Sequence, residues 1–183
     1  MSEKDKMLNG RYYNAEDKIL REERQRARQL CFEFNQTPPE QENKCRDILN
    51  QLLGQIGKNC CIHKNFFCDY GYNIEIGDNF FGNYNLVILD CARISIGNNV
   101  FVGPNVGIYS AGHPIDAAER QQGLEYAKPI SIGSDVWIGG GTSVLPGVNI
   151  GSNCVIGAGS VVASDIPDNS LAVGNPCRVI RQI

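Results

Sequence analysis

Apolar side chains return at every sixth position near the middle of the second half of the chain. The positions are Ile132, Ile138, Val144, Ile150, Ile156 and Val162, and glycine follows four of them. A six-residue period fits neither an α-helix nor an alternating strand. It is typical of a parallel β-helix, in which each hexad forms one short strand and a turn, with glycine supporting a strained corner. We therefore predict a mainly β fold of roughly five three-sided coils, at ~18 residues per coil.

The same period begins at Ile56, so residues 56–183 are predicted to form one β-helical domain. The phase of the apolar positions slips by two residues near 79–85, which predicts a local insertion there. From 108 to 129 the pattern is absent, and this segment is predicted to be a long loop that leaves the β-helix. Long loops in compact domains are usually functional or disordered.

Residues 1–55 follow a different pattern, with apolar positions at helical spacing between charged ones. Asn14 is predicted to cap a first helix, with Asp17 three residues further on. The segment 37–40, Thr-Pro-Pro-Glu, is a second helix start signal, and Gly54 ends that helix. We expect an N-terminal helical hairpin that packs on the repeat domain.

Composition excludes several classes of function. The net charge of −3 argues against a nucleic-acid or anionic-membrane partner. No apolar run approaches the ~20 residues of a membrane span. The start, MSEKDKM, lacks the apolar segment of a signal peptide, and none of the eight cysteines forms a C-x-x-C pair. A cytoplasmic protein with reduced cysteines is the resulting expectation.

A regular β-helix has no natural pocket, so chemistry is expected on the loop that leaves it. That loop carries His113, one of only two histidines in the chain and a group that titrates near neutrality. A zinc hydratase would need three histidine ligands. The chain has no Cys/His cluster at zinc spacing, so no metal site is expected.

Five segments of the chain match a known family in order and without obvious gaps: 68–74, 82–85, 112–116, 136–140 and 174–181. On these segments, and on its helical N-terminal part, the chain resembles the hexapeptide-repeat sugar O-acetyltransferases, the maltose and galactoside O-acetyltransferase family. The resemblance implies a left-handed parallel β-helix and a homotrimer with active sites between neighbouring subunits. It also implies acetyl-CoA as donor and the hydroxyl of a small sugar as acceptor.

The resemblance assigns roles to six residues around the reaction. His113 corresponds to the general base that takes the proton of the acceptor hydroxyl. Asn83 corresponds to the residue that stabilises the tetrahedral intermediate. Four carboxylates are expected on the acceptor side: Asp69, Asp90, Asp17 and Glu125. Structural alternatives stay open: a turn residue for Asn83 or Asp90, and a solvated carboxylate for Glu125.

On the donor side, Gly140 and Ala158 correspond to positions where the backbone meets the pantetheine arm. The resemblance further implies cofactor contacts by Arg178 and Arg181, suited to phosphate, although a solvated basic tail is the alternative. Trp137 is expected near the same groove. Ala163 and Ser164 stand where the galactoside enzyme has Thr-Lys, so one phosphate partner is missing, and Lys128 is a substitute by loop position.

Two other functions remain open at this point. An acetyltransferase of the same kind can use a non-sugar hydroxyl acceptor, such as a xenobiotic or serine. A non-catalytic β-helical scaffold is the second alternative. The sequence does not identify the sugar or the hydroxyl that is acetylated.

Overall fold

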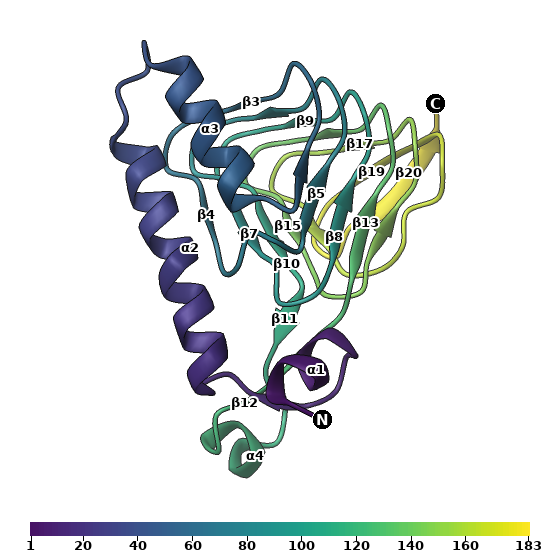
Figure 1. The fold of residues 1–183 in the computed structure, drawn as a ribbon. Helices are drawn as coiled ribbons and strands as arrows, with labels where there is room; N and C mark the ends of the chain where they lie inside the picture. Colours follow the sequence, from purple (N-terminus) through teal and green to yellow (C-terminus); the bar gives the residue numbers. More distant parts are fainter.

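The computed structural model describes residues 1–183 and contains three parallel sheets that wind around one axis (Figure 1). Sheet I contains β2 (Gln55–Ile56), β5 (Ile74–Ile76), β8 (Ile94–Ile96), β13 (Ile130–Ile132) and β16 (Asn149–Ile150). Sheet II contains β3 (Cys61–Ile62), β6 (Phe81–Gly82), β9 (Phe101–Val102), β14 (Trp137–Ile138), β17 (Val155–Ile156), β19 (Ser170–Val173) and the antiparallel β20 (Arg178–Gln182). Sheet III contains β4 (Phe67–Cys68), β7 (Val87–Leu89), β10 (Gly107–Tyr109), β15 (Ser143–Val144) and β18 (Val161–Val162).

The chain passes from sheet I to II to III in every coil, which gives the predicted left-handed β-helix with five coils and part of a sixth. The apolar side chains at every sixth position all point inward. Ile132, Ile138 and Val144 are buried, and each pairs in register with its counterpart one coil away. Full burial of such a side chain contributes about 1.5–3 kcal/mol. The residues that recur at every sixth position thus form the core of the β-helix.

The corners of the coils differ from the prediction, because asparagine rather than glycine takes most of the left-handed conformations. Asn79 and Asn99 have φ of 58° and 57°, and the Asn79 Nδ2 donates to the Asn99 Oδ1 at 2.9 Å. Asparagine tolerates this conformation and bonds its neighbour one coil away. The glycines after apolar positions serve close stacking instead: a Cβ at Gly97 would lie 2.8 Å from the carbonyl carbon of Gly133.

The phase slip was predicted at the wrong place. Ile76, Gly82 and Ile88 follow one another in sheets I, II and III without an insertion, and the buried Gly82 hid this regularity. The extra residues lie where the chain passes from sheet III back to sheet I, after β4 and again after β7. Early coils are therefore 20 residues long, as between Asn59 and Asn79, whereas later coils take 18. This widened corner holds most of the site described below.

The N-terminal part contains three helices, α1 (Glu3–Leu8), α2 (Lys18–Gln36) and α3 (Glu42–Leu52). The predicted start at Asn14 is wrong, because Asp17 caps α2 and accepts from the Ile19 amide at 3.0 Å. The second predicted start is also wrong, because Thr37 ends α2 and α3 begins five residues later, at Glu42. The helix α1, with its Ser2–Asp5 capping box, was not predicted. None of these helices combines the length and the apolar character that crossing a lipid bilayer requires.

Helices α2 and α3 share one hydrophobic core with the β-helix. Phe34 of α2 and Leu52 of α3 belong to the same cluster of 34 buried residues as the coil side chains. In Figure 1, α2 runs alongside the β-helix and α3 lies near its N-terminal end. The expectation that the helices pack on the repeats is therefore confirmed.

The segment predicted as a loop leaves the β-helix after β10 and returns at β13. It is structured: β11 (Ala111–Gly112) pairs antiparallel with β12 (Leu124–Ala127), and α4 (Ala117–Gln121) lies between them. On its other side β12 pairs with β1 (Tyr13–Asn14) from the N-terminal part. We call residues 110–129 the arm. Figure 1 shows the arm projecting from the β-helix, with α1 beside β12.

Candidate functional site

His113 lies at the outer end of β11 on the arm, where most of its ring is exposed. Its Nδ1 is 3.3 Å from the carbonyl oxygen of Leu124. A carbonyl oxygen only accepts, so this contact requires the proton on Nδ1. The lone pair of Nε2 is then free to accept a proton from a bound hydroxyl, which is the geometry of a general base.

Glu125 lies on the Nε2 side of the imidazole and is itself held in place. Its Oε1 is 4.0 Å from the His113 Nε2, and its Oε2 accepts from the Tyr13 hydroxyl at 2.7 Å. Tyr13 is fully buried, and burial raises its pKa, so its hydroxyl remains a donor. A carboxylate in this position stabilises an imidazolium once the histidine has taken a proton.

Asp69 belongs to the same cluster, through contacts that the sequence did not reveal. Cys91 lies beside Tyr13 and donates to the Asp69 Oδ2 at 3.4 Å. Burial raises the pKa of Asp69, whereas the nearby Arg24 lowers it. Contacts therefore run from His113 through Glu125, Tyr13 and Cys91 to Asp69.

Arg24 and Tyr70 complete the cluster on the side of α2. The Arg24 guanidinium donates to the Tyr70 hydroxyl at 3.0 Å and to the Ala15 carbonyl at 2.6 Å. In the sequence, Arg24 is one of many charged residues between the apolar positions of segment 1–55. Its helical spacing carried no signal of this contact, because Tyr70 is 46 residues away in the chain.

A cavity of about 680 Å³ opens along the N-terminal half of α2 beside this cluster. Only polar and charged side chains line it: Glu16, Lys18, Arg21, Glu22, Arg24, Gln25 and Arg28. Arg24 and Arg28 are both close enough to lower the pKa of Asp69. The cavity thus presents hydrogen-bonding groups, and no apolar wall, next to the carboxylates.

The structure contradicts the expected contact of Asp90 with a sugar. Asp90 is 0% exposed, and its carboxylate accepts from the backbone amides of Asp69, Tyr70 and Asn73 at 3.1, 2.9 and 3.2 Å. Burial raises the pKa of Asp90 to about 7, against the opposing effect of these amides. Its role is structural, because it holds the widened corner that carries Asp69 and Tyr70.

We expect Asp90→Asn to lower the free energy of unfolding by about 1–3 kcal/mol. The amide can accept through one oxygen only, so its NH2 group must face a backbone amide that also donates. Denaturant unfolding followed by circular dichroism measures the change. Asp47→Asn, a conservative change at an exposed position of α3, is the matched control with little expected effect. Equal stability of both variants would contradict the structural role.

Asp17 is already used as the cap of α2. One carboxylate oxygen, Oδ1, accepts from the amides of Ile19 and Leu20, which stabilises the helix by about 0.5–2 kcal/mol. The structure gives no contact between Asp17 and the cluster around His113. Asp17 therefore has a structural role in α2, and its contact with an acceptor stays a prediction.

Asn83, Gly140 and Ala158 lie on a different edge, where the chain passes from sheet II to sheet III. They follow β6, β14 and β17, which belong to one ladder of sheet II. Asn83 accepts from the Tyr84 amide through Oδ1 at 2.8 Å, which leaves its NH2 group free to donate. Asn83 and His113 make no contact within one chain.

The II–III edge carries no side chain larger than that of alanine near Gly140 and Ala158. In the early coils this edge carries Asn65, Asn85 and Asn105, whereas Gly141 and Gly159 take the equivalent left-handed positions later. A Cβ at Gly159 would meet no atom within 4 Å. Packing therefore does not require a small residue there, and the open backbone fits the close approach of an extended ligand.

Arg178 and Arg181 lie at the C-terminal end of sheet II, where both are exposed on β20. Arg178 pairs with Val173, which stands one coil beyond Gly157 and so near Ala158. Ala163 and Ser164 are also exposed, but they follow β18 and lie on the edge between sheets III and I. The predicted donor residues are therefore divided between two edges of one chain.

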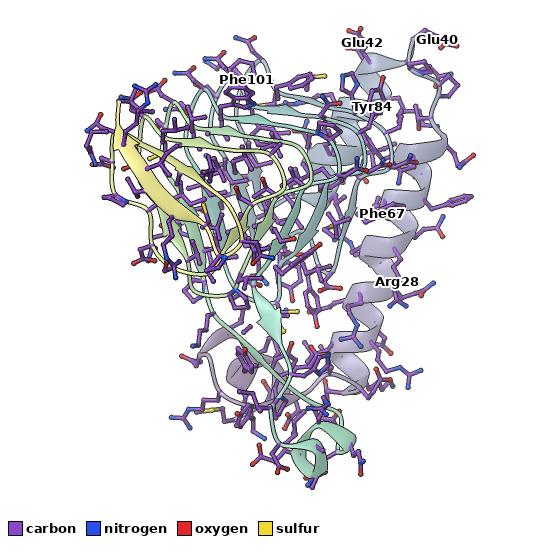
Figure 2. All side chains as sticks on the ribbon, turned by 180° about the vertical axis from the view of Figure 1, so that it is seen from behind. Arg28, Glu40, Glu42, Phe67, Tyr84 and Phe101 are labelled. Carbon is purple, nitrogen blue, oxygen red and sulfur yellow. The ribbon has the colours of Figure 1, made fainter.

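Trp137 belongs to an aromatic ladder on the outer face of sheet II. Trp137, Phe101 and Phe81 occupy equivalent positions in consecutive strands, and the rings of Phe81 and Phe101 are 6.2 Å apart. Trp137 is 57% exposed and Phe101 53%. Figure 2 shows Phe101 and Tyr84 at the surface of this part of the β-helix. No three acidic, histidine or cysteine side chains are grouped to hold a metal ion.

Three known sequence families match parts of the chain. The maltose acetyltransferase hexapeptide capping motif matches residues 6–57. The six-repeat bacterial transferase hexapeptide matches residues 129–164, and the hexapeptide repeat of succinyl-transferase matches residues 93–115. These matches cover the helical part and the β-helix on both sides of the arm.

Solved structures of similar proteins match the whole length of this chain. A maltose O-acetyltransferase from Clostridium difficile is 54% identical, with a TM-score of 0.99, and the match covers 100% of this chain and 98% of that one. A galactoside acetyltransferase in complex with coenzyme A is 40% identical, with a TM-score of 0.97 and coverage of 100% and 92%. A hexapeptide-repeat acetyltransferase from Vibrio cholerae, complexed with acetyl-coenzyme A, is 39% identical, with a TM-score of 0.91 and coverage of 100% and 98%. This chain belongs to the maltose and galactoside O-acetyltransferase family of hexapeptide-repeat acetyltransferases.

Proposed function

We propose that the protein transfers an acetyl group from acetyl-CoA to a hydroxyl of a small sugar such as maltose or glucose. The observation that carries the proposal is the state of His113: Nδ1 is held by the Leu124 carbonyl and Nε2 is free beside Glu125. Membership of an acetyltransferase family, with coenzyme A or acetyl-CoA bound in two similar proteins, supports the choice of donor.

In the proposed reaction, His113 Nε2 takes the proton of the acceptor hydroxyl while the oxygen attacks the thioester carbonyl. An alcohol is too weak a nucleophile at neutral pH without such a base. The tetrahedral intermediate then collapses, the C–S bond breaks, and the imidazolium returns the proton to the leaving thiolate. Glu125, fixed by Tyr13, stabilises the imidazolium between these two proton transfers.

The oxyanion is stabilised, in this proposal, by Asn83 of a neighbouring copy. Asn83 lies on the II–III edge and the arm on the III–I edge, so the two side chains cannot meet within one chain. The amide NH2 of Asn83 is free to donate, as an oxyanion requires. The exposed aromatic ladder, and Ile115 on the arm at 98% exposure, are apolar surfaces that a second copy would cover. A homotrimer with shared sites satisfies both requirements.

The acceptor would enter through the polar cavity along α2. Its lining has no hydrophobic residue, which favours a polyhydroxyl molecule over an aromatic xenobiotic. Asp69 and Glu125 are the carboxylates available to accept from sugar hydroxyls. The helical segment 1–55 would then close the acceptor side of a site that the β-helix 56–183 carries.

The donor would lie along the II–III edge, with its pantetheine arm against Gly140 and Ala158. Arg178 and Arg181 would bind the phosphates beyond the last coil, and Trp137 lies on the adjoining face of sheet II. Ala163 and Ser164 stand on the other edge and would contact the donor of a neighbouring copy. We also propose a cytoplasmic location, since all eight cysteines are free thiols.

We expect Arg178→Ala to raise the KM for acetyl-CoA about tenfold, because a charge-assisted bond to phosphate contributes about 1.5–3 kcal/mol. The KM for the sugar should change little. Steady-state kinetics with each substrate varied in turn measures both constants. Arg11→Ala, which removes an exposed arginine far along the chain from β20, is the matched control. A larger change in the sugar KM than in the donor KM would contradict the donor position.

The function itself is tested by thiol release from acetyl-CoA with maltose, glucose, galactosides, serine and chloramphenicol as acceptors. A sugar should give the highest kcat/KM, with the acetyl ester identified by mass spectrometry. Preference for serine or chloramphenicol would support the alternative acceptor class instead. Release of thiol with none of these acceptors above the rate without acceptor would contradict the proposal.

A further inference from the structure

Cys31 and Cys68 form a pair of buried thiols that the proposed reaction does not use. Cys31 lies in the C-terminal half of α2 and Cys68 at the end of β4, 37 residues apart in the chain. Their sulfur atoms are 3.7 Å apart, and both are free. We infer that these two cysteines are a redox-sensitive pair that a hydroperoxide converts into a disulfide between helix α2 and the first coil.

A cavity gives small oxidants access to this pair. Its volume is about 230 Å³, and both cysteines contribute to its wall. The other lining residues are Arg28, Phe32, Asn35, Gln36, Asn65 and Phe67. Figure 2 shows Arg28 on α2 and Phe67 near it on the facing coil. The cavity has room for hydrogen peroxide.

The two thiols differ in a way that suits a nucleophile and a resolving partner. The hydrogen bond with Cys68 lowers the pKa of Cys31, whereas the same contact and burial raise the pKa of Cys68. Cys31, whose pKa is lowered, is the proposed nucleophile, and Cys68 is the proposed resolving partner. Oxidation at low-pKa, accessible cysteines next to a second thiol is the usual arrangement of redox-sensitive sites.

The chemistry balances with the hydroperoxide as the only oxidant. The Cys31 thiolate attacks one peroxide oxygen, the O–O bond breaks, and a sulfenic acid forms with release of water or an alcohol. Cys68 then attacks the Cys31 sulfur, the S–O bond breaks, and a second water leaves. Two thiols are oxidised to one disulfide, and one peroxide is reduced.

The disulfide would clamp α2 against the β-helix. Its sulfur atoms must approach from 3.7 Å to about 2.05 Å, a shift that a helix packed on a coil by side chains can make. Closing a loop of 37 residues removes much of the freedom of the unfolded chain. We expect Tm to rise by roughly 5–10 °C on oxidation and to fall back on reduction.

The test treats the reduced protein with hydrogen peroxide and then alkylates the remaining thiols under denaturing conditions. Six of the eight cysteines should react with the alkylating agent, and a non-reduced tryptic digest should contain the peptide pair joined through Cys31 and Cys68. Dithiothreitol should restore eight reactive thiols. Cys31→Ser and Cys68→Ala should each abolish the joined peptide and the rise in Tm.

Cys154→Ser is the matched control, because Cys154 is equally buried but its sulfur contacts only the Ser152 and Pro167 carbonyls. This variant should oxidise like the wild type. A disulfide that involves other cysteines, an unchanged count of eight thiols, or a crosslink that lowers Tm would each overturn the inference. None of these outcomes bears on acetyl transfer, so the two proposals fail independently.

Discussion

Replacing His113 by alanine should lower kcat by two to four orders of magnitude, roughly the contribution of a general base. The His113 Nδ1 donates to the Leu124 carbonyl at 3.3 Å, and this bond orients the ring and leaves Nε2 unprotonated. No other side chain on the arm is an imidazole. The ring is mostly exposed, so its loss should leave the fold and the Tm unchanged. Steady-state kinetics and a thermal melt measure the two effects.

A measurement of coenzyme A binding distinguishes the loss of the general base from the loss of the donor site. Titration calorimetry should give the same Kd for coenzyme A in wild type and His113→Ala, because none of the proposed contacts with the pantetheine arm or the phosphates involves the imidazole. His63→Ala is the control, since His63 stacks on Tyr84 at 4.5 Å and has no part in the proposed reaction. Turnover of His113→Ala within a few-fold of wild type would contradict the assignment of the base.

Two inactive variants should restore each other's activity when they are mixed in one trimer. Asn83→Ala should lower kcat by about two to three orders of magnitude through loss of an oxyanion donor. If each site takes His113 from one subunit and Asn83 from the next, a mixed cyclic trimer of the two variants contains one intact site. Such trimers should therefore reach about one third of the wild-type kcat.

Coexpression with two different affinity tags, followed by purification on both, yields the mixed trimers for this measurement. Trimers that carry both substitutions in every chain provide the baseline. Sedimentation should first show that the wild type is a trimer. A clean monomer, or mixed trimers that remain at the baseline, would contradict the shared site, because a site within one chain cannot be restored by mixing.

The arrangement of edges explains why the wild-type trimer should matter for activity. The arm leaves one edge of sheet III, and the backbone without large side chains at Gly140 and Gly141 lies on the other. In the proposed trimer, each chain would therefore contribute half of two different sites. Dilution below the dissociation constant of the trimer should abolish activity while the β-helix keeps its circular dichroism spectrum.

Sequence alone predicted the β-helix because the inward positions repeat at a fixed local spacing. Ile132, Ile138 and Val144 are six residues apart, and their burial follows from that spacing in every coil. It also predicted within two residues where the arm leaves the β-helix, because the pattern stops at 108 and β10 ends at Tyr109. The resemblance to a family then directed attention to His113, and the open Nε2 agrees with the role that it implied.

Only the tertiary structure revealed what surrounds these residues. Asp90 was predicted to contact a sugar, but its carboxylate accepts hydrogen bonds from three backbone amides of the preceding coil. Tyr13 and Arg24 carried no signal, because their partners Glu125 and Tyr70 are 112 and 46 residues distant. The hydrogen bonds between the corner asparagines, such as Asn79 and Asn99, were missed for the same reason, since they join residues 20 positions apart. Spacing along the chain determines which face a side chain occupies, whereas its chemical role depends on groups that only folding brings within bonding distance.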